Sequence, residues 1–258
     1  MSTIAVGDIH GHLQPLREVL AAIRAEAGPD DTVVLLGDYI DRGAHSKECI
    51  AEILSFRATA AARIVCLMGN HEEWLLRTMR DSTRHSWLLG MEALDTIRSY
   101  SPEAAERIRH AASLGGDALY LDRCPLPYDL FFDAMPAAHR AFFEELQLFE
   151  ETPDCICSHG GLDPDGGALG AQRPGSLIWG ATGFQDRYAG ERALVYGHWN
   201  NAELDAGGWP HPRIIANTIG IDTISHGVLT AIRMPERQII QSSRHARRAS
   251  SLSPEVEP

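Results

Sequence analysis

Apolar and polar positions in the N-terminal part of the chain follow two alternating patterns. Three short apolar runs, 3–7, 32–37 and 63–69, are rich in β-branched residues, which favours buried strands. Between them, residues 13–28 and about 46–57 repeat apolar positions at helical spacing, and the first of these segments stops at a Gly-Pro pair. Strands that alternate with helices in this way predict a parallel sheet with right-handed crossover connections.

The pattern changes in residues 74–150, which are rich in Trp, Leu, Ala and Arg and have helical periodicity. Ser101 followed by Pro102 is typical of a helix start, and Pro136 indicates another. We interpret this region as a helical insertion within one domain and not as a separate domain.

Strand-like runs return after the insertion and continue almost to the end of the chain. They are DCICSHGG (154–161), RALVYGHW (192–199), RIIANTIGID (213–222) and GVLTAIRMPERQIIQ (227–241). The last run is expected to be a hairpin that turns at Pro235 and Glu236. Residues 243–258 are rich in Ser, Arg and Pro without periodicity, which predicts a disordered tail after a single domain of residues 1–242.

Polar and charged residues follow each of the first three predicted strands at the point where the strand ends. They are Asp8 and His10 after the first strand, Asp38, Asp41 and Arg42 after the second, and Asn70 and His71 after the third. Neighbouring strands lie about 4.8 Å apart, and ligands in open α/β sheets bind at the carboxyl ends of the strands. We therefore expect these side chains to converge on one edge of the sheet.

Two later strand ends supply histidines, which complete a set of six candidate metal ligands. The six are Asp8, His10, Asp38, Asn70, His159 and His198. Their oxygen and imidazole donors, with no thiolate among them, suit Mn²⁺, Fe or Zn²⁺. Six side chains are too many for one catalytic ion that keeps open positions, but they suit two ions, which need a shared ligand. Because a carboxylate has two oxygens, the central Asp38 is the candidate bridge.

Three residues at the same strand ends remain, and their chemistry suits a phosphate ester. Arg42 can hold a phosphate with its fork of donors. His71 can protonate a leaving oxygen, and Asp41 can orient the imidazole ring and keep it cationic. Two divalent ions together with Arg42 would outweigh the charge of the ligand carboxylates, which gives a local positive site suited to a phosphate dianion.

The composition of the whole chain limits its partners. The 258 residues carry a formal net charge of −12, which counts against nucleic acid as a partner, because phosphate contacts need clustered Lys and Arg. Nowhere do about 18 apolar residues run together, so no membrane partner is expected, and the N-terminus lacks a signal-peptide pattern. Five cysteines without disulfide-framework spacing are expected to be reduced thiols, which favours a cytoplasmic protein.

Five motifs in a fixed order carry a family resemblance: GDIHG, GDYIDRG, GNHE, SHGGL and YGHW. Together they resemble the phosphoprotein phosphatase family within the calcineurin-like metallophosphoesterases, and the resemblance extends from Asp8 to about Arg233. The segment 87–100 (WLLGMEALDTIRSY) further resembles the helical insertion of bacterial members. The resemblance implies an α/β fold in which a β-sandwich is flanked by helices.

The resemblance also implies a role for each candidate residue. Asp8, His10 and Asp38 would hold one ion, and Asp38, Asn70, His159 and His198 would hold the other. Arg42 would bind phosphate, and His71 paired with Asp41 would be the general acid. The implied activity is hydrolysis of phosphomonoesters by a hydroxide that two divalent ions activate, with Mn²⁺ favoured. The implied substrate is a phosphorylated protein or a small phosphoester.

One position departs from the bacterial pattern, which places a second phosphate-binding arginine two residues after a tryptophan. The corresponding segment here reads LIWGATGF, and the position is occupied by Ala181. Candidate substitutes are Arg173, Arg187, Arg192 and Arg213. The departure affects the expected affinity for phosphate and the type of substrate, but not the metal site.

Three functions compete on these observations. The leading one is a bacterial-type serine/threonine protein phosphatase. The second is a dinucleoside-polyphosphate hydrolase similar to bacterial diadenosine tetraphosphatases, whose sequences also contain GHW but commonly lack the residue found here as Asp41. The third is a non-catalytic pseudo-phosphatase that only binds metal. The motifs are common to these proteins, so they select neither a physiological substrate nor a native metal nor an oligomeric state.

Overall fold

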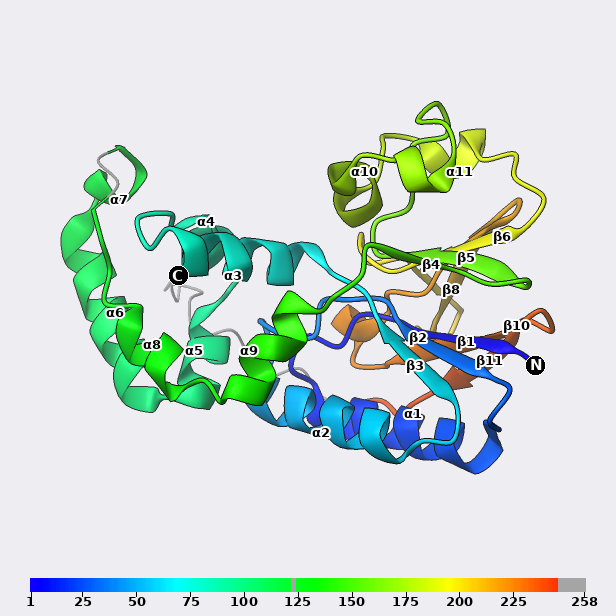
Figure 1. The fold of residues 1–258 in the computed structure, drawn as a ribbon, viewed down its shortest axis with the longest axis horizontal. Helices are drawn as coiled ribbons and strands as arrows, with labels where there is room; N and C mark the ends of the chain where they lie inside the picture. The colour runs from blue at the N-terminus through cyan, green and yellow to red at the C-terminus, as the bar shows by residue number, and fades with distance from the viewer. Residues whose placement is uncertain (122–123, 246–258) are drawn as a thin grey trace.

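The computed structural model describes residues 1–121 and 124–245. Two β-sheets pack face to face, and helices cover the outer side of each sheet (Figure 1). The covering helices are α1 (Leu13–Glu26) and α2 (Ser46–Thr59) on one side, and α10 (Pro174–Trp179) and α11 (Phe184–Arg187) on the other. This arrangement is the α/β sandwich flanked by helices that the sequence predicts.

The first sheet has the strand order β11-β10-β1-β2-β3. Its strands are β1 (Thr3–Val6), β2 (Thr32–Leu35), β3 (Arg63–Cys66), β10 (Thr230–Met234) and β11 (Gln238–Gln241). β1, β2 and β3 run parallel, and α1 and α2 form the crossover connections between them. β10 and β11 form an antiparallel hairpin. The predicted parallel strands and the C-terminal hairpin are therefore confirmed.

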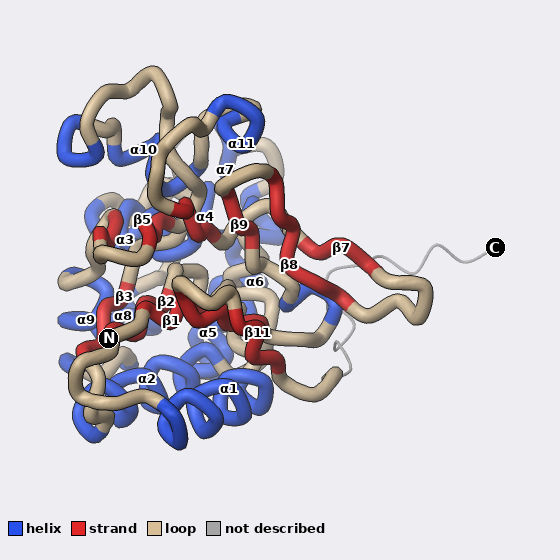
Figure 2. The backbone as a smooth tube through the Cα atoms, turned by 90° about the vertical axis from the view of Figure 1, so that its right-hand side faces the viewer, coloured by secondary structure: helices blue, strands red, loops and turns tan. Residues whose placement is uncertain are grey.

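The second sheet has the strand order β4-β5-β6-β9-β8-β7. Its strands are β4 (Phe149–Glu151), β5 (Cys155–Ser158), β6 (Ala193–Tyr196), β7 (Ala202–Leu204), β8 (Pro210–Ile215) and β9 (Thr218–Gly220). Short 3₁₀ turns, η1 (Leu169–Ala171) and η2 (Ile224–His226), lie in the connections. β5 and β6 run parallel, so they end on the same edge. Figure 2 shows the β7–β8 hairpin projecting away from the two layers.

Apolar side chains fill the spaces between these layers. Residues from both sheets, among them Val34, Val195 and Ile219, form the core between the sheets. A larger cluster joins the first sheet to α1, α2 and the helical insertion. A smaller cluster, with Leu177 and Phe184, packs α10 and α11 on the outer face of the second sheet. Because central strands such as β1 and β6 are buried along their whole length, the strand ends are the places where polar side chains can gather.

The helical insertion follows β3 directly. Its helices are α3 (Asn70–Arg80), α4 (Ser86–Gly90), α5 (Leu94–Tyr100), α6 (Pro102–Gly115), α7 (Ala118–Leu121), α8 (Asp129–Ala134) and α9 (Ala137–Glu144). Ser101 caps α6 as predicted, and its side chain accepts a hydrogen bond from the backbone N–H of Ala104 at 3.1 Å. The helical region begins at Asn70 rather than at residue 74, so its first helix carries two candidate site residues.

After β11 the chain returns to the body of the fold. Ser243 donates a hydrogen bond to Glu18, and the backbone N–H of His245 donates to the carbonyl oxygen of Gly227 at 2.8 Å. The predicted tail from residue 243 thus begins with residues that make contacts, and its remainder, 246–258, lies outside the described residues. In the part of the chain that the structure describes, we find no helix with the length and apolar character that a membrane span requires.

Candidate functional site

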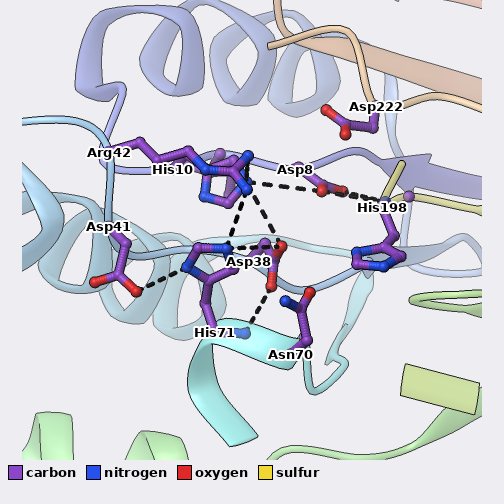
Figure 3. A network of polar contacts seen from close by, with 12 residues as sticks. Asp8, His10, Asp38, Asp41, Arg42, Asn70, His71, His198 and Asp222 are labelled. Carbon is purple, nitrogen blue, oxygen red and sulfur yellow. Dashed lines mark hydrogen bonds and ion pairs between the residues drawn. The ribbon is translucent and has the colours of Figure 1, made fainter. Parts of the chain in front are cut away.

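The carboxyl ends of five strands, from both sheets, bring the six candidate metal ligands together. Figure 3 labels all of them except His159. Asp38 follows β2 and lies at the centre of the set. One of its carboxylate oxygens lies 3.5 Å from Nε2 of His10, and the other lies 3.4 Å from Nε2 of His159. The side-chain oxygen of Asn70 lies 3.0 Å from Nε2 of His159. The ends of β1, β2 and β3 therefore converge as the alternating pattern predicts, and the ends of β5 and β6 meet them from the second sheet.

Two groups of metal-ligating atoms occur in this cluster. Within each group, the ligand atoms of three residues lie within 4.8 Å of one another. One group is His10, Asp38 and His71, and the other is Asp38, His159 and His198. Asp38 is common to both, which is the arrangement that a shared ligand requires. Asp8 lies beside the first group, with a carboxylate oxygen 3.9 Å from Nε2 of His10.

The hydrogen bonds around the histidines fit metal binding. Nδ1 of His10 donates to the carbonyl oxygen of Ile40, and Nδ1 of His159 donates to that of Leu36, each at 3.0 Å. A carbonyl can only accept, so in these rings Nε2 is left to face the centre of the site, which is the usual arrangement for a metal ligand. Burial lowers the pKa of His198 to about 3, so this ring is neutral and has a lone pair for an ion.

The charges in the cluster also favour cations. Burial, followed by the charges of Asp222 and Asp38, raises the pKa of Asp8 well above its usual range. Although burial acts in the opposite direction, the carboxylate of Asp38 raises the pKa of His159 to about 10. Buried carboxylates that crowd one another therefore bind positive charge strongly here, and divalent ions would supply that charge. The donor types, their hydrogen bonds and their charges all fit a divalent metal centre.

A second constellation lies beside the cluster and contains Arg42, His71 and Asp41. Nδ1 of His71 donates to Oδ2 of Asp41 at 2.7 Å, and both side chains are fully buried. The guanidinium of Arg42 lies 2.8 Å from Nε2 of His10 and 3.3 Å from Nε2 of His71. Although burial opposes the shift, the carboxylates of Asp38 and Asp41 raise the pKa of His71 above its ordinary value. The pair can thus hold a proton at His71.

The helical insertion holds Asp41 in place, a role that is not apparent from the sequence. Nε1 of Trp87 donates to Oδ2 of Asp41 at 2.8 Å. The hydroxyl of Thr96 donates to Oδ1 at 2.6 Å and accepts from the backbone N–H of Asp41 at 2.8 Å. Trp87 lies on α4 and Thr96 on α5. Both belong to the segment 87–100, and its resemblance to the bacterial insertion was the only signal for them.

Glu72, the last residue of the GNHE motif, was also missed as a functional residue. Its buried carboxylate accepts hydrogen bonds from the backbone N–H groups of Asp38 and Tyr39, each at 2.9 Å. A third bond comes from the backbone N–H of Gly69 at 3.1 Å. Glu72 therefore fixes the bend of the chain that places the Asp38 side chain between the histidines.

The backbone is unusually constrained at this site. Among the described residues, ten non-glycine residues have positive φ, and seven of them belong to the site or the loop beside it. The seven are His10, Asp38, Asp41, Arg42, His198, Trp199 and Asn200. A positive φ is costly for most side chains and persists where the surrounding contacts determine it, typically at functional sites.

Two motif glycines are needed for space. A Cβ at Gly197 would lie 2.1 Å from Oδ1 of Asp8, and one at Gly69 would lie 2.1 Å from Oδ1 of Asp38. No side chain can be accommodated at such a distance without displacing the carboxylate. The glycines of YGHW and GNHE therefore allow the backbone to approach the candidate metal ligands.

A pocket of about 300 Å³ opens onto this cluster. Its lining residues are Asp8, Asp38, Arg42, Trp179, His198, Trp199, Asn200 and Asp222. Asp222 was not selected from the sequence. Its Oδ2 accepts from the backbone N–H of Asn200 at 2.7 Å, and its Oδ1 is buried without a hydrogen-bond partner among the described residues.

Arg42 is the only arginine among the residues that line this pocket. Arg187 pairs instead with Asp165, and Arg192 pairs with Glu151. Neither Arg173 nor Arg213 lines the pocket in the described part of the chain. Among the residues that the structure describes, none of the four candidate substitutes lines this pocket.

Comparison with known proteins identifies the family. Residues 1–227 match the model of the calcineurin-like phosphoesterase family. The chain therefore belongs to this family, a class of enzymes that act on phosphoester bonds. The resemblance that the five motifs indicate is confirmed, and so is the fold that it implies.

Curated relatives match parts of the chain. The symmetrical bis(5′-nucleosyl)-tetraphosphatase of Pseudomonas fluorescens is 32% identical over 111 residues, which are 42% of this chain and 35% of that protein. A catalytic chain of protein phosphatase 2A from Dictyostelium discoideum is 40% identical over 67 residues, which are 26% of this chain and 21% of that protein. The matched part of the chain thus spans about a third or less of the length of these relatives.

Solved structures share the fold over nearly the whole chain. A candidate diadenosine tetraphosphatase has a TM-score of 0.60 and 17% identity, with 93% of this chain and 92% of that chain covered. A serine/threonine phosphatase from Saccharomyces cerevisiae has a TM-score of 0.50 and 16% identity, with 97% and 82% covered. At these identities the similarity shows the architecture alone.

Proposed function

We propose that this protein is a metal-dependent phosphomonoester hydrolase of the serine/threonine protein phosphatase type. The buried Asp41–His71 pair, beside two groups of metal-ligating atoms that share Asp38, is the observation that carries the proposal. Membership of the calcineurin-like phosphoesterase family supports it.

The proposed ligands divide into two sets with one common member. Asp8, His10 and Asp38 would hold one divalent ion, and Asp38, Asn70, His159 and His198 would hold the other. When bound, the ions would act as Lewis acids on the phosphate and lower the pKa of the attacking water. Mn²⁺ suits these oxygen and imidazole donors. A cytoplasmic location would keep the five free cysteines reduced.

The chain's own groups would bind the phosphate and protonate the leaving group. The fork of Arg42 would hold two non-bridging oxygens of the phosphate. Nε2 of His71 would give its proton to the leaving oxygen, while Asp41 orients the ring by accepting from Nδ1. A serine or threonine alkoxide is a poor leaving group and needs this proton. An intact Asp41–His71 pair therefore favours alkyl phosphomonoesters.

A second candidate is hydrolysis of dinucleoside polyphosphates. The tetraphosphatase of Pseudomonas fluorescens is among the relatives at 32% identity, and this chain has the GHW sequence at residues 197–199. Protein loaded with Mn²⁺ should be assayed on a phosphoserine peptide, diadenosine tetraphosphate and p-nitrophenyl phosphate. We expect turnover of the peptide and the nitrophenyl ester. Cleavage of diadenosine tetraphosphate alone would replace the first proposal with the second, and the absence of all turnover would favour a non-catalytic metal-binding protein.

Replacing Arg42 should weaken substrate binding because, among the described residues, no other arginine lines the pocket. We expect Arg42→Ala to reduce kcat/KM by roughly a hundredfold, the usual contribution of one charge-assisted donor to a transition state. Arg187→Ala is the matched control, since Arg187 is paired with Asp165 outside the pocket. Steady-state kinetics that show equal losses for the two variants would mean that Arg187 reaches the phosphate and that Arg42 is not the sole arginine donor.

Removing the hydroxyl of Thr96 should slow the reaction without removing the metals. Thr96→Val keeps the shape of the side chain but leaves the buried Asp41 carboxylate with one donor fewer, which should destabilise the fold by about 1–3 kcal/mol. If Thr96 positions the acid, turnover of an alkyl phosphate should fall roughly tenfold and that of a nitrophenyl ester less. Thr78→Val removes a hydroxyl that donates to the Arg84 carbonyl, away from the site. It should lose comparable stability in thermal unfolding and retain full activity.

A further inference from the structure

Trp199 is the one tryptophan, of five in the chain, whose side chain is mostly exposed. Its relative exposure is 58%, whereas Trp87 is fully buried and Trp74, Trp179 and Trp209 are partly covered. An isolated exposed apolar residue on a protein surface is ordinary. Trp199 is different because it lines the pocket that opens onto the candidate metal ligands.

The loop that carries Trp199 has a costly backbone conformation. His198, Trp199 and Asn200 have φ values of 53°, 67° and 49°, all in the left-handed region. The conformation is held by several contacts: the backbone N–H of Asn200 donates to Asp222 at 2.7 Å, and the side-chain amide of Asn201 donates to the carbonyl of Gly197 at 2.7 Å. A strained conformation that several contacts maintain is typical of a functional site.

This conformation places the neighbouring side chains of His198 and Trp199 in different parts of the site. The ring of His198 lies in the cluster around Asp38, and its backbone N–H donates to the carboxylate of Asp8 at 3.1 Å. The indole of Trp199 contacts that ring in an edge-to-face arrangement, with centroids 4.4 Å apart at an angle of 67°. Trp179 meets His198 edge-on at 5.9 Å. Two indoles therefore form an aromatic wall of the pocket next to the charged groups that would hold the phosphate.

The pocket is lined by charged side chains in one part and by aromatic side chains in another. Asp8, Asp38 and Arg42 supply the charged part, and Trp179 and Trp199 supply the aromatic part. The indole nitrogen of Trp179 already donates to Glu73 at 2.8 Å, and its ring packs against Trp74. Trp199 is the member of the wall whose side chain is mostly exposed to solvent.

We propose that Trp199 is a specificity residue that stacks on a planar aromatic group attached to the substrate phosphate, such as a nucleobase or a phenyl ring. Stacking on an indole face is favourable for either group and tolerates differences in the ring. The inference rests on the proposed phosphoester hydrolysis and adds to it a preference for phosphomonoesters whose alcohol group carries an aromatic ring over those that lack one. A nucleotide and a phenyl ester share this chemistry, and matched probes separate them.

The test compares probes that differ only in the aromatic group. Calorimetry on metal-loaded protein in the His71→Asn background, in which hydrolysis is slowed, gives the affinities of adenosine 5′-monophosphate and of ribose 5-phosphate, which lacks the base. For Trp199→Ala we expect affinity for the nucleotide to fall about tenfold to a hundredfold, with affinity for ribose 5-phosphate unchanged. Trp199→Phe, which keeps a ring, should restore most of the loss. Trp209→Ala is the control, since Trp209 lies on the β7–β8 hairpin and contacts Gln241 and Arg244.

Kinetics then identify the source of the aromatic group. In Trp199→Ala, kcat/KM for phenyl phosphate should fall more than kcat/KM for glycerol phosphate, chiefly through KM. A larger loss for adenosine 5′-monophosphate than for phenyl phosphate would select the nucleobase, and the reverse would select the phenyl ring. Equal losses on aromatic and aliphatic probes, in affinity or in kcat/KM, would overturn the inference. If the wild-type protein hydrolyses none of these esters, the proposed function fails, and the calorimetric comparison still decides the role of Trp199.

Discussion

Asp38→Ala is expected to abolish both metal binding and hydrolysis. The two carboxylate oxygens of Asp38 lie 3.5 Å from Nε2 of His10 and 3.4 Å from Nε2 of His159, so one side chain serves both proposed ion sites. Without it, the two ions have no common ligand to hold them close together. Elemental analysis after loading with Mn²⁺ should fall from near two ions per chain to near zero, and phosphatase activity should fall to background.

The control variant for this result, Asp8→Ala, distinguishes the two proposed ion sites. Asp8→Ala removes a ligand proposed for one ion only, so this variant should retain about one ion per chain. Circular dichroism should show that both variants keep the fold, because the sheets are held by apolar cores that do not include these carboxylates. A wild-type stoichiometry that stays at one ion, with activity intact, would contradict the two-ion proposal.

The convergence of the site was predictable because it follows from strand direction. β1, β2 and β3 are parallel and in register, so residues that follow them must meet at one edge. The same argument applies to β5 and β6, whose ends carry His159 and His198. That two separate sheets meet at this point is a consequence of face-to-face packing, and the motif resemblance supplied it rather than the apolar pattern.

Residues that act through other residues were not predictable in this way. Trp87 and Thr96 reach Asp41 only because α4 and α5 pack beside the first sheet. Nothing in the periodicity of a helix says which buried polar atom its side chains will meet. Asp222 follows β9 and contacts the loop after β6, and this contact depends on the arrangement of the second sheet. Such roles need the tertiary packing.

The local backbone conformation could not be predicted from the sequence either. Gly69 and Gly197 were read as parts of motifs, and the structure shows that a Cβ at either would meet a candidate ligand carboxylate. His10 and Asp38 adopt left-handed φ, which neither residue type favours strongly enough to predict. Trp199 is a similar case, because the GHW sequence gives no sign that its indole lies in the open wall of the pocket.

His71→Asn should retain the metals and lose most of the rate. An amide at this position cannot donate the proton that His71 holds, and loss of a general acid usually costs 10²–10⁴-fold in kcat. The loss should be near the upper value for an alkyl phosphate and small for p-nitrophenyl phosphate, whose leaving group needs no proton. Parallel kinetics on the two substrates measure this difference directly.

A competing role for His71 follows from the geometry itself. Nε2 of His71 lies 3.8 Å from Asp38, and His71 belongs to one of the two groups of ligand atoms, so it could bind an ion instead of donating a proton. The two roles predict different metal contents for His71→Asn. If His71 is the acid, the variant keeps near two ions per chain, and if His71 is a metal ligand, the variant loses one.

Asp41→Asn provides a second comparison, because Asp41 contacts Nδ1 of His71 and is not in either ligand group. It should share the leaving-group dependence of His71→Asn with a smaller loss. Equal losses on alkyl and nitrophenyl esters, together with a missing ion, would make His71 a metal ligand and leave the leaving group to be protonated by water.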